Sequence, residues 1–166
     1  KITPSRVVTT FAGSTKGFAD GIGSAAKFNA PRGITIDASG NLYIADTSNN
    51  KIRKITPNGD VTTIAGSTKG DIDGTGTTAQ FTDPIGITVD ANNNIYVSDN
   101  YYKIKKITPS GVVTTFAGSI RGYADGAGSE ALFINPDAIA VNTNGNLCVA
   151  DSGNHKIREI TPSGFV

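Results

Sequence analysis

Aspartates at equivalent places in the chain are the residues whose type and spacing could do chemistry. Asp46, Asp99 and Asp151 each end a short apolar run, in IAD, VSD and VAD. Carboxylates gathered at one place could bind a metal ion or transfer protons. Each of these, however, stands where a strand is expected to meet a turn, and a carboxylate there ordinarily accepts backbone N–H hydrogen bonds. We therefore interpret the three aspartates as structural.

A second group of aspartates lies in the motifs DGIG, DGTG and DGAG, at Asp20, Asp73 and Asp125. Asp-Gly spacing of this kind is found in calcium-binding loops, which supply several oxygen ligands. The motif here lacks the further acidic ligands, so we interpret it as an Asx-type turn with a helix cap. The sequence predicts no metal site and no cofactor.

Two reactive side chains, His155 and Cys148, occur once each and in only one part of the chain. Cys148 fills a strand position, which favours packing as a small apolar residue. His155 has no second histidine, serine elbow or orienting carboxylate to give it a catalytic role. Asp37 and Asp90 end another strand, and Asn142 replaces them in the third equivalent, so a charge is not required there. No catalytic residue is predicted.

Cations and tyrosines in the expected loops are candidate binding residues. Lys16, Lys69 and Arg121 occupy equivalent positions, in STKG, STKG and SIRG. Solvated charges balanced by the aspartates a few residues on are the alternative interpretation. Tyr101 and Tyr102 stand where the equivalent loops of the other two units carry polar residues. Tyrosine is favoured at recognition surfaces. Local packing over a shortened loop is the alternative for this pair. These five residues form the predicted ligand-binding face.

Three copies of one unit position these residues. Residues 2–54, 55–106 and 107–159 align with one another, and a fourth copy begins at 160–166. We expect one repeat region over residues 1–166. Apolar residues at every second position, in short runs bounded by turn residues, predict strands. Repeats of this length are typical of solenoids and propellers.

Four strands are expected in each unit, at residues 33–37, 41–46, 51–55 and 61–65 in the first. The connections between them are short and rich in Pro, Gly and Asn, which predicts antiparallel neighbours. A loop of about twenty residues, with a single helical turn near 24–28, leads to the next unit. A four-stranded antiparallel sheet repeated at this period is a propeller blade. The predicted fold class is all-β, with three blades per chain.

The segment PRGITIDASGNLYIADTSNNKIRKI and its two counterparts resemble the NHL repeat, and the resemblance covers the whole chain. The extension VTTFAGSTKGFADGIGSAAKF resembles the long-loop variety of this repeat common in bacterial, often exported, proteins. The resemblance implies a β-propeller, typically of six blades. It also implies an extracellular or cell-envelope location and a fragment or short relative of a longer exported protein.

The order of the predicted strands implies an assembly. The chain begins with the fourth strand of one blade and ends after the third strand of another. Three blades cannot close a ring, and a lone arc leaves large apolar faces in water. We expect a homodimer that closes a six-bladed ring by strand exchange. The residues expected to exchange are Arg6, Val7, Val8, Thr9, Thr10, Phe11, Ala12, Ile157 and Ile160.

Charge and hydropathy narrow the classes of partner. Fifteen Lys and Arg against fourteen Asp and Glu give a net charge of +1, so no long-range field favours nucleic acid or a membrane. The apolar runs are too short for a membrane-spanning helix. Eight cations concentrate on the predicted third strands, where we interpret them as rim charges that discourage edge pairing. They are Lys51, Arg53, Lys54, Lys103, Lys105, Lys106, Lys156 and Arg158.

The predicted function is a non-enzymatic scaffold for self-assembly and for binding a protein or a small molecule on the long-loop face. Two alternatives follow from the resemblance. Some six-bladed relatives are hydrolases or lyases with a metal in the central channel, and some NHL propellers bind RNA. We do not expect nucleic acid or a membrane as a partner.

Overall fold

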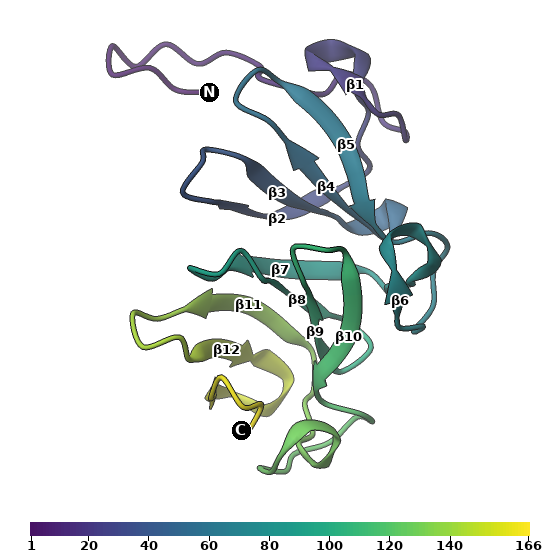
Figure 1. Cartoon of the computed structure of the whole chain (residues 1–166), viewed down its shortest axis with the longest axis vertical. Helices are drawn as coiled ribbons and strands as arrows, with labels where there is room; N and C mark the ends of the chain where they lie inside the picture. The colour runs from purple at the N-terminus through teal and green to yellow at the C-terminus, as the bar shows by residue number, and fades with distance from the viewer.

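The computed structural model describes all 166 residues, which form three antiparallel sheets stacked one after another (Figure 1). The first sheet contains β1 (Gly21–Ile22), β2 (Pro31–Ile36), β3 (Leu42–Asp46), β4 (Lys51–Ile55) and β5 (Asp60–Ala65). The second contains β6 (Gly74–Thr75), β7 (Pro84–Val89), β8 (Ile95–Asp99), β9 (Lys103–Ile107) and β10 (Val112–Ala117). The third contains β11 (Pro136–Val141), β12 (Leu147–Asp151) and β13 (Lys156–Ile160).

The four predicted strands of the first unit match β2 to β5 to within two residues at each end. The predicted helical turn is a 3₁₀ turn one residue earlier, and four further turns of this kind follow along the chain. The five turns are η1 (Gly23–Ala25), η2 (Thr47–Asn49), η3 (Gly76–Thr78), η4 (Gly128–Glu130) and η5 (Ser152–Asn154). The all-β class and the antiparallel pairing are confirmed.

The first two sheets have five strands instead of the expected four, whereas the third has the three strands with which the chain was expected to end. In the first two sheets the long loop folds back and adds a two-residue strand outside the fourth main strand. Gly21 pairs with Val61 in the first sheet, and Gly74 pairs with Val113 in the second. This extra strand satisfies backbone groups at an edge that would otherwise face water. In the third sheet, Phe165 and Val166 begin the missing fourth strand, and Phe165 pairs with Ala127 of the long loop.

Short Asx turns join the first two main strands of each sheet. Asp37 Oδ1 accepts the N–H groups of Ser39 at 2.9 Å and Asn41 at 2.8 Å. Asn142 Oδ1 accepts the N–H group of Asn144 at 2.9 Å in the third sheet. The prediction that this position needs an acceptor oxygen but no charge is confirmed.

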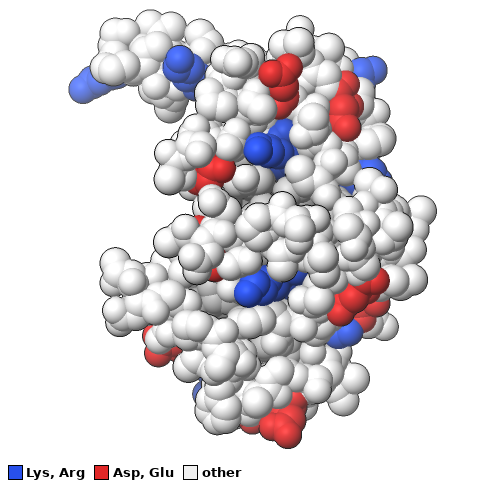
Figure 2. Space-filling view, in the orientation of Figure 1, with Lys and Arg blue, Asp and Glu red and all other residues white.

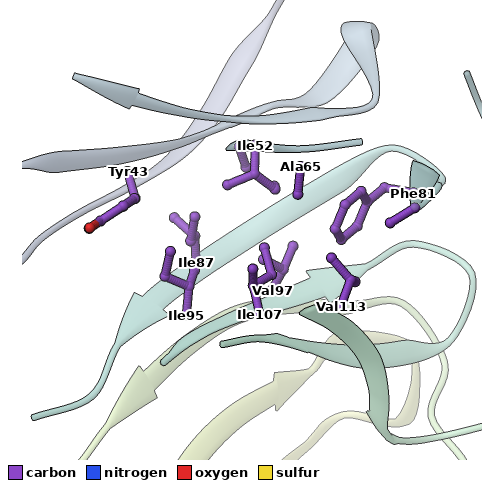
Figure 3. Packing of buried hydrophobic residues seen from close by; sticks show 11 residues of the cluster. Tyr43, Ile52, Ala65, Phe81, Ile87, Ile95, Val97, Ile107 and Val113 are labelled. Carbon is purple, nitrogen blue, oxygen red and sulfur yellow. The ribbon is translucent and has the colours of Figure 1, made fainter. Parts of the chain in front are cut away.

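The core lies between consecutive sheets, as Figure 3 shows for the first and second. Tyr43, Ile52 and Ala65 of the first sheet meet a row of side chains from the second sheet and from the long loop that precedes it. That row is Phe81, Ile87, Ile95, Val97, Ile107 and Val113. An equivalent cluster joins the second sheet to the third. Because β2 lies beside β7 and β7 beside β11, the sheets share a common inner edge, as propeller blades do.

Candidate functional site

A buried cation on the third main strand organises the loop end of the first sheet. Arg53 in β4 is fully buried, and its guanidinium donates to Asp46 Oδ2 at 2.7 Å and Asp20 Oδ1 at 2.6 Å. Asp46 also accepts the backbone N–H of Asn29 and the side-chain amide of Asn49, both at 2.8 Å. The predicted backbone hydrogen bond to this aspartate is confirmed. The unit ties the ends of β3 and β4 to the long loop.

The third sheet repeats this arrangement. Arg158 donates to Asp151 at 3.0 Å and to Asp125 at 2.5 Å. Asp151 accepts the backbone N–H of Ile134 and the side-chain amide of Asn154, both at 2.8 Å. The same three kinds of partner, an arginine, a backbone N–H and an asparagine amide, therefore surround the buried carboxylate in the first and third sheets.

Half-exposed aromatic rings cover these two guanidinium groups. The Cζ atom of Arg53 lies 5.0 Å from the ring centroid of Phe18, and that of Arg158 lies 5.0 Å from the centroid of Tyr123. Each ring lies over a cation and faces solvent on its other side, which is a cation–π arrangement.

Two sequence interpretations are corrected by these contacts. The third-strand cations are not all rim charges, because Arg53, Lys105 and Arg158 are buried. A buried Lys or Arg is found almost only where it is paired with an acidic side chain. The DG-motif aspartates are not local turn caps. Asp20 reaches across to the N–H of Thr63 at 3.1 Å as well as to Arg53, because the long loop lies along the outer strand.

The second sheet departs from the other two at two positions of this arrangement. A lysine, Lys105, replaces the buried arginine, and Asp71 replaces the covering aromatic residue. Lys105 Nζ lies 3.0 Å from Asp73 and 3.1 Å from Asp71, and Lys103 also pairs with Asp71. Asp99, the equivalent of the paired aspartates, is fully buried and forms no ion pair.

Asp99 keeps only backbone hydrogen bonds. The loop between β8 and β9 is one residue shorter than its equivalents and lacks the asparagine that donates to the carboxylate in the other sheets. Thr82 N–H donates to Asp99 Oδ1 at 2.9 Å, and Tyr101 N–H donates at 3.4 Å. Burial raises the pKa of Asp99 from 3.8 to about 7, outweighing these hydrogen bonds and the charge of Lys105, while Asp71 adds to the rise.

This raised pKa predicts a pH-dependent stability. The native state binds the Asp99 proton more tightly than the unfolded chain does, so this contribution is complete below about pH 4 and is lost as pH rises through about 7. Relative to the Asp99→Asn variant, the wild-type free energy of unfolding should fall by a few kcal/mol across that window. Chemical denaturation of both proteins at several pH values measures the difference. A difference that does not change with pH would contradict the assignment.

The predicted tyrosine pair is brought together. The rings of Tyr101 and Tyr102 stack with centroids 5.9 Å apart and planes 29° apart. Tyr101 is half exposed. Tyr102 adopts φ 64°, the left-handed conformation that Asn50 and His155 hold in the other two sheets. The pair forms a partly exposed aromatic surface in the loop whose backbone contacts the buried Asp99.

The three predicted loop cations are exposed and lie one on each long loop. Lys69 Nζ pairs with Asp83 at 2.6 Å. The expected balance by the DG-motif aspartates is wrong, because those carboxylates bind the buried cations instead. Lys16 and Arg121 point into solvent in their own loops. Basic and acidic side chains are interspersed on the face seen in Figure 2, most of which is uncharged.

The first sheet exposes an apolar face at the amino-terminal end of the stack. Ile34 and Ile36 in β2 are 63% and 60% exposed, whereas Ile87 and Ile139, the equivalents of Ile34, are 5% and 8% exposed. A cavity of about 690 Å³ lies on this face, between the amino-terminal segment and β2. This is where a preceding sheet would pack.

The third sheet exposes the complementary face at the other end. Ile157 in β13 is 77% exposed, whereas its equivalents Ile52 and Ile104 are fully buried. In the intact sheets Ile52 pairs with Ala65 of the fourth main strand. Ile157 lacks that neighbour, because the fourth strand of the third sheet stops at Val166.

The predicted exchange segment forms a short hairpin with its turn at Arg6, where the other units have glycine. Ile2 pairs with Val8, which is the register of Ile55 and Val61 in the first sheet. Residues 6–12 form no strand in a sheet, and Thr9 and Thr10 are exposed. Phe11 and Ala12 pack against the first sheet.

Two parts of the exchange prediction need correction. The Ile160 side chain is fully buried in its own chain, and the place opposite it, which Val61 holds opposite Ile55 in the first sheet, falls to Val166 of the same chain. Phe165 and Val166 already occupy the places of Val7 and Val8, because Gly126 pairs with Val166 in the register of the complete sheets. Only residues 9–12 can extend this strand without displacing its beginning.

The remaining sequence candidates do not gather into a catalytic group. Cys148 is half-buried in β12, and His155 lies in the exposed loop after η5. The structure contains no group of three or more His, Cys, Asp or Glu side chains placed to hold a metal ion. None of its helices has the length and apolar character needed to cross a membrane.

Family comparisons match both ends of the chain. The signature of the teneurin NHL domain matches residues 14–72, and the signature of the NHL repeat matches residues 133–160. The human "NHL repeat-containing protein 2" is 31% identical over 151 residues, which cover 80% of this chain. The chain spans about a fifth of that relative's length, 21%.

Solved structures share the arrangement of sheets. An auxiliary nutrient binding protein from Bacteroides thetaiotaomicron superposes with a TM-score of 0.68 and 25% identity, over 82% of this chain and 37% of that one. A virginiamycin B lyase from Staphylococcus aureus superposes with a TM-score of 0.60 and 21% identity, over 81% of this chain and 39% of that one. Each match supports a propeller-like fold.

Proposed function

The chain belongs to the NHL-repeat family, and on this premise we propose that it is a non-enzymatic, propeller-like scaffold that assembles with a second copy of itself. The observation that carries the proposal is the pair of open faces. Ile34 at one end and Ile157 at the other are exposed, although their equivalents are buried at the junctions between sheets. Apolar faces of this kind are rarely left in water.

A second copy can cover both open faces, because the repeat makes each face equivalent to one side of an internal junction between sheets. Two arcs of three sheets would form six blades, with each open face packed as the internal junctions are. Residues 9–12 of one copy would continue the strand that Phe165 and Val166 begin in the other. Ala12 would then lie beside Ile157, as Ala65 lies beside Ile52. The exchange would complete the three-stranded edge sheet.

The polar groups at the inner edge support a role without catalysis. Asp37 and Asp90 hold the turns after the innermost strands through backbone N–H groups. The buried aspartates at the loop end accept backbone hydrogen bonds, and two of the three also pair with arginine. These carboxylates already have structural partners. The likeness to a lyase extends to the fold alone at 21% identity.

The long-loop face is the proposed site for a protein or small-molecule ligand. The stacked Tyr101 and Tyr102 offer an exposed aromatic surface, and Lys16, Lys69 and Arg121 surround the same end of the sheets. Tyrosine supplies large contact area at low entropic cost. The similar nutrient-binding protein lends support to a ligand-binding role.

The molar mass in solution tests the scaffold proposal. Light scattering of the 17.1 kDa chain should give twice that mass at micromolar concentration. A monodisperse, cooperatively folded monomer would remove the closed dimer. A larger assembly would support the pairing of open faces but would mean that the ring has a number of blades other than six.

A further inference from the structure

The third residue of the innermost strand differs between the sheets. β2 begins PRG, β7 begins PIG and β11 begins PDA, so Gly33 and Gly86 correspond to Ala138. Gly86 is buried and Gly33 half-buried by the sheet that follows each of them. Ala138 is exposed, because no sheet follows it in this chain.

The two glycines lie directly against the backbone of the following sheet. A Cβ atom on Gly33 would stand 2.3 Å from the carbonyl oxygen of Ile85, and one on Gly86 would stand 2.2 Å from that of Asp137. Close carbon–oxygen contacts between strands normally measure about 3.3–3.6 Å. A carbonyl oxygen held in a sheet cannot rotate aside as a side chain can. Consecutive sheets therefore reach this separation only where the earlier strand carries glycine.

Hydroxyl groups strengthen the same two internal junctions. Thr47 Oγ1 donates to the carbonyl oxygen of Pro84 at 2.7 Å, across the first junction. Ser98 Oγ donates to the carbonyl oxygen of Asp137 at 2.5 Å, across the second. In the third sheet, Ala150 takes the place of Ser98, and the Ser152 hydroxyl donates within its own sheet to Asn135. The outward face of the third sheet therefore lacks the glycine and the hydroxyl of Ser98, and it keeps a hydroxyl, that of Ser152, only at the place of Thr47.

We propose that this face binds β2 of a second copy with the two innermost strands held apart by the Ala138 methyl group, and that it is the weakest junction of the ring. The inference rests on the proposed dimer. The carbonyl group that the methyl would meet is that of Arg32 in the second copy, the equivalent of Ile85 and Asp137. Residue 138 thus determines how tightly two chains join, and the ring opens between chains rather than within one.

The test is the dissociation constant of Ala138→Gly, measured by sedimentation over a range of protein concentrations. Relief of an overpacked methyl should tighten each junction about tenfold, and a closed dimer with two junctions about a hundredfold. Ala140→Gly is the matched control, since Ala140 is an exposed alanine on the same strand and the change adds the same backbone freedom. The control dimer should be no tighter than wild type.

Two of the three outcomes separate this inference from the proposed function. If wild type dimerises and Ala138→Gly binds no more tightly, the inference is overturned while the dimer stands. If wild type is a monomer and Ala138→Gly a dimer, the steric role of residue 138 is supported and the wild-type dimer is removed. If both remain monomers, the dimer and the inference fall together. Circular dichroism of each variant checks that the strands are retained.

Discussion

Replacing Ile157 with aspartate should convert the proposed dimer into a folded monomer. Ile157 is 77% exposed within one chain, so a carboxylate there remains in water and leaves the three sheets intact. In the closed ring it would occupy the place of Ile52 and Ile104, which are fully buried. Burying an unpaired carboxylate costs several kcal/mol, and the ring contains two such sites. Dimer affinity should fall at least about a thousandfold by light scattering.

Ile120→Asp is the control for this change. Ile120 is 69% exposed on the long loop, and its equivalents are the polar residues Thr15 and Thr68. The same charge is introduced there without entering a junction between sheets, so the mass should stay that of the dimer. Thermal unfolding should be cooperative in both variants. A dimer that survives Ile157→Asp would show that this face is not the interface.

Replacing Asp46 with asparagine should cause the largest loss of stability within one chain. Arg53 pairs with two carboxylates, Asp46 and Asp20. Asp46 is fully buried, as Arg53 is, whereas the Asp20 side chain is 45% exposed. Removing one partner of a buried ion pair typically costs about 3–5 kcal/mol. For a chain of this size the melting temperature should fall by roughly 10 °C. Calorimetry measures the shift.

Asp99→Asn at neutral pH is the matched comparison. Asp99 occupies the same place in the second sheet, but it has no ion pair, and burial raises its pKa to about 7. An amide therefore replaces a carboxyl that is partly protonated already, and the loss should be much smaller than for Asp46→Asn. Equal losses in the two variants would mean that the Arg53 ion pair contributes little.

The main strands could be predicted because their signal is local and occurs three times. Alternating apolar residues such as Ile34 and Ile36 specify one face of a strand, and Pro-Gly turns set its ends. The Asx turn at Asp37 was predictable for the same reason, since its acceptor and donors lie within four residues. Each of these features needs only neighbouring residues.

The buried cations could not be predicted from such local patterns. Arg53 looks like a surface charge among its neighbours, and it becomes internal only because the long loop brings Asp20 over it from 33 residues away. One signal was available. An aspartate ends the second strand of each unit, and a cation follows it at Arg53, Lys105 or Arg158. The extra strand β1 was missed because its two residues include a glycine and carry no alternating pattern.

The pairing of β1 with β5 changes where one cooperative unit begins and ends. It links the long loop at Gly21 to the fourth main strand at Val61, so residues from about Gly13 to Ala65 form one unit whose two ends are joined by hydrogen bonds. The sequence repeat starts about eleven residues earlier and divides that unit. Native-state hydrogen exchange should therefore report protected blocks aligned with the closed units. Amide groups of the amino-terminal hairpin should exchange first, because the hairpin belongs to no closed unit of its own chain.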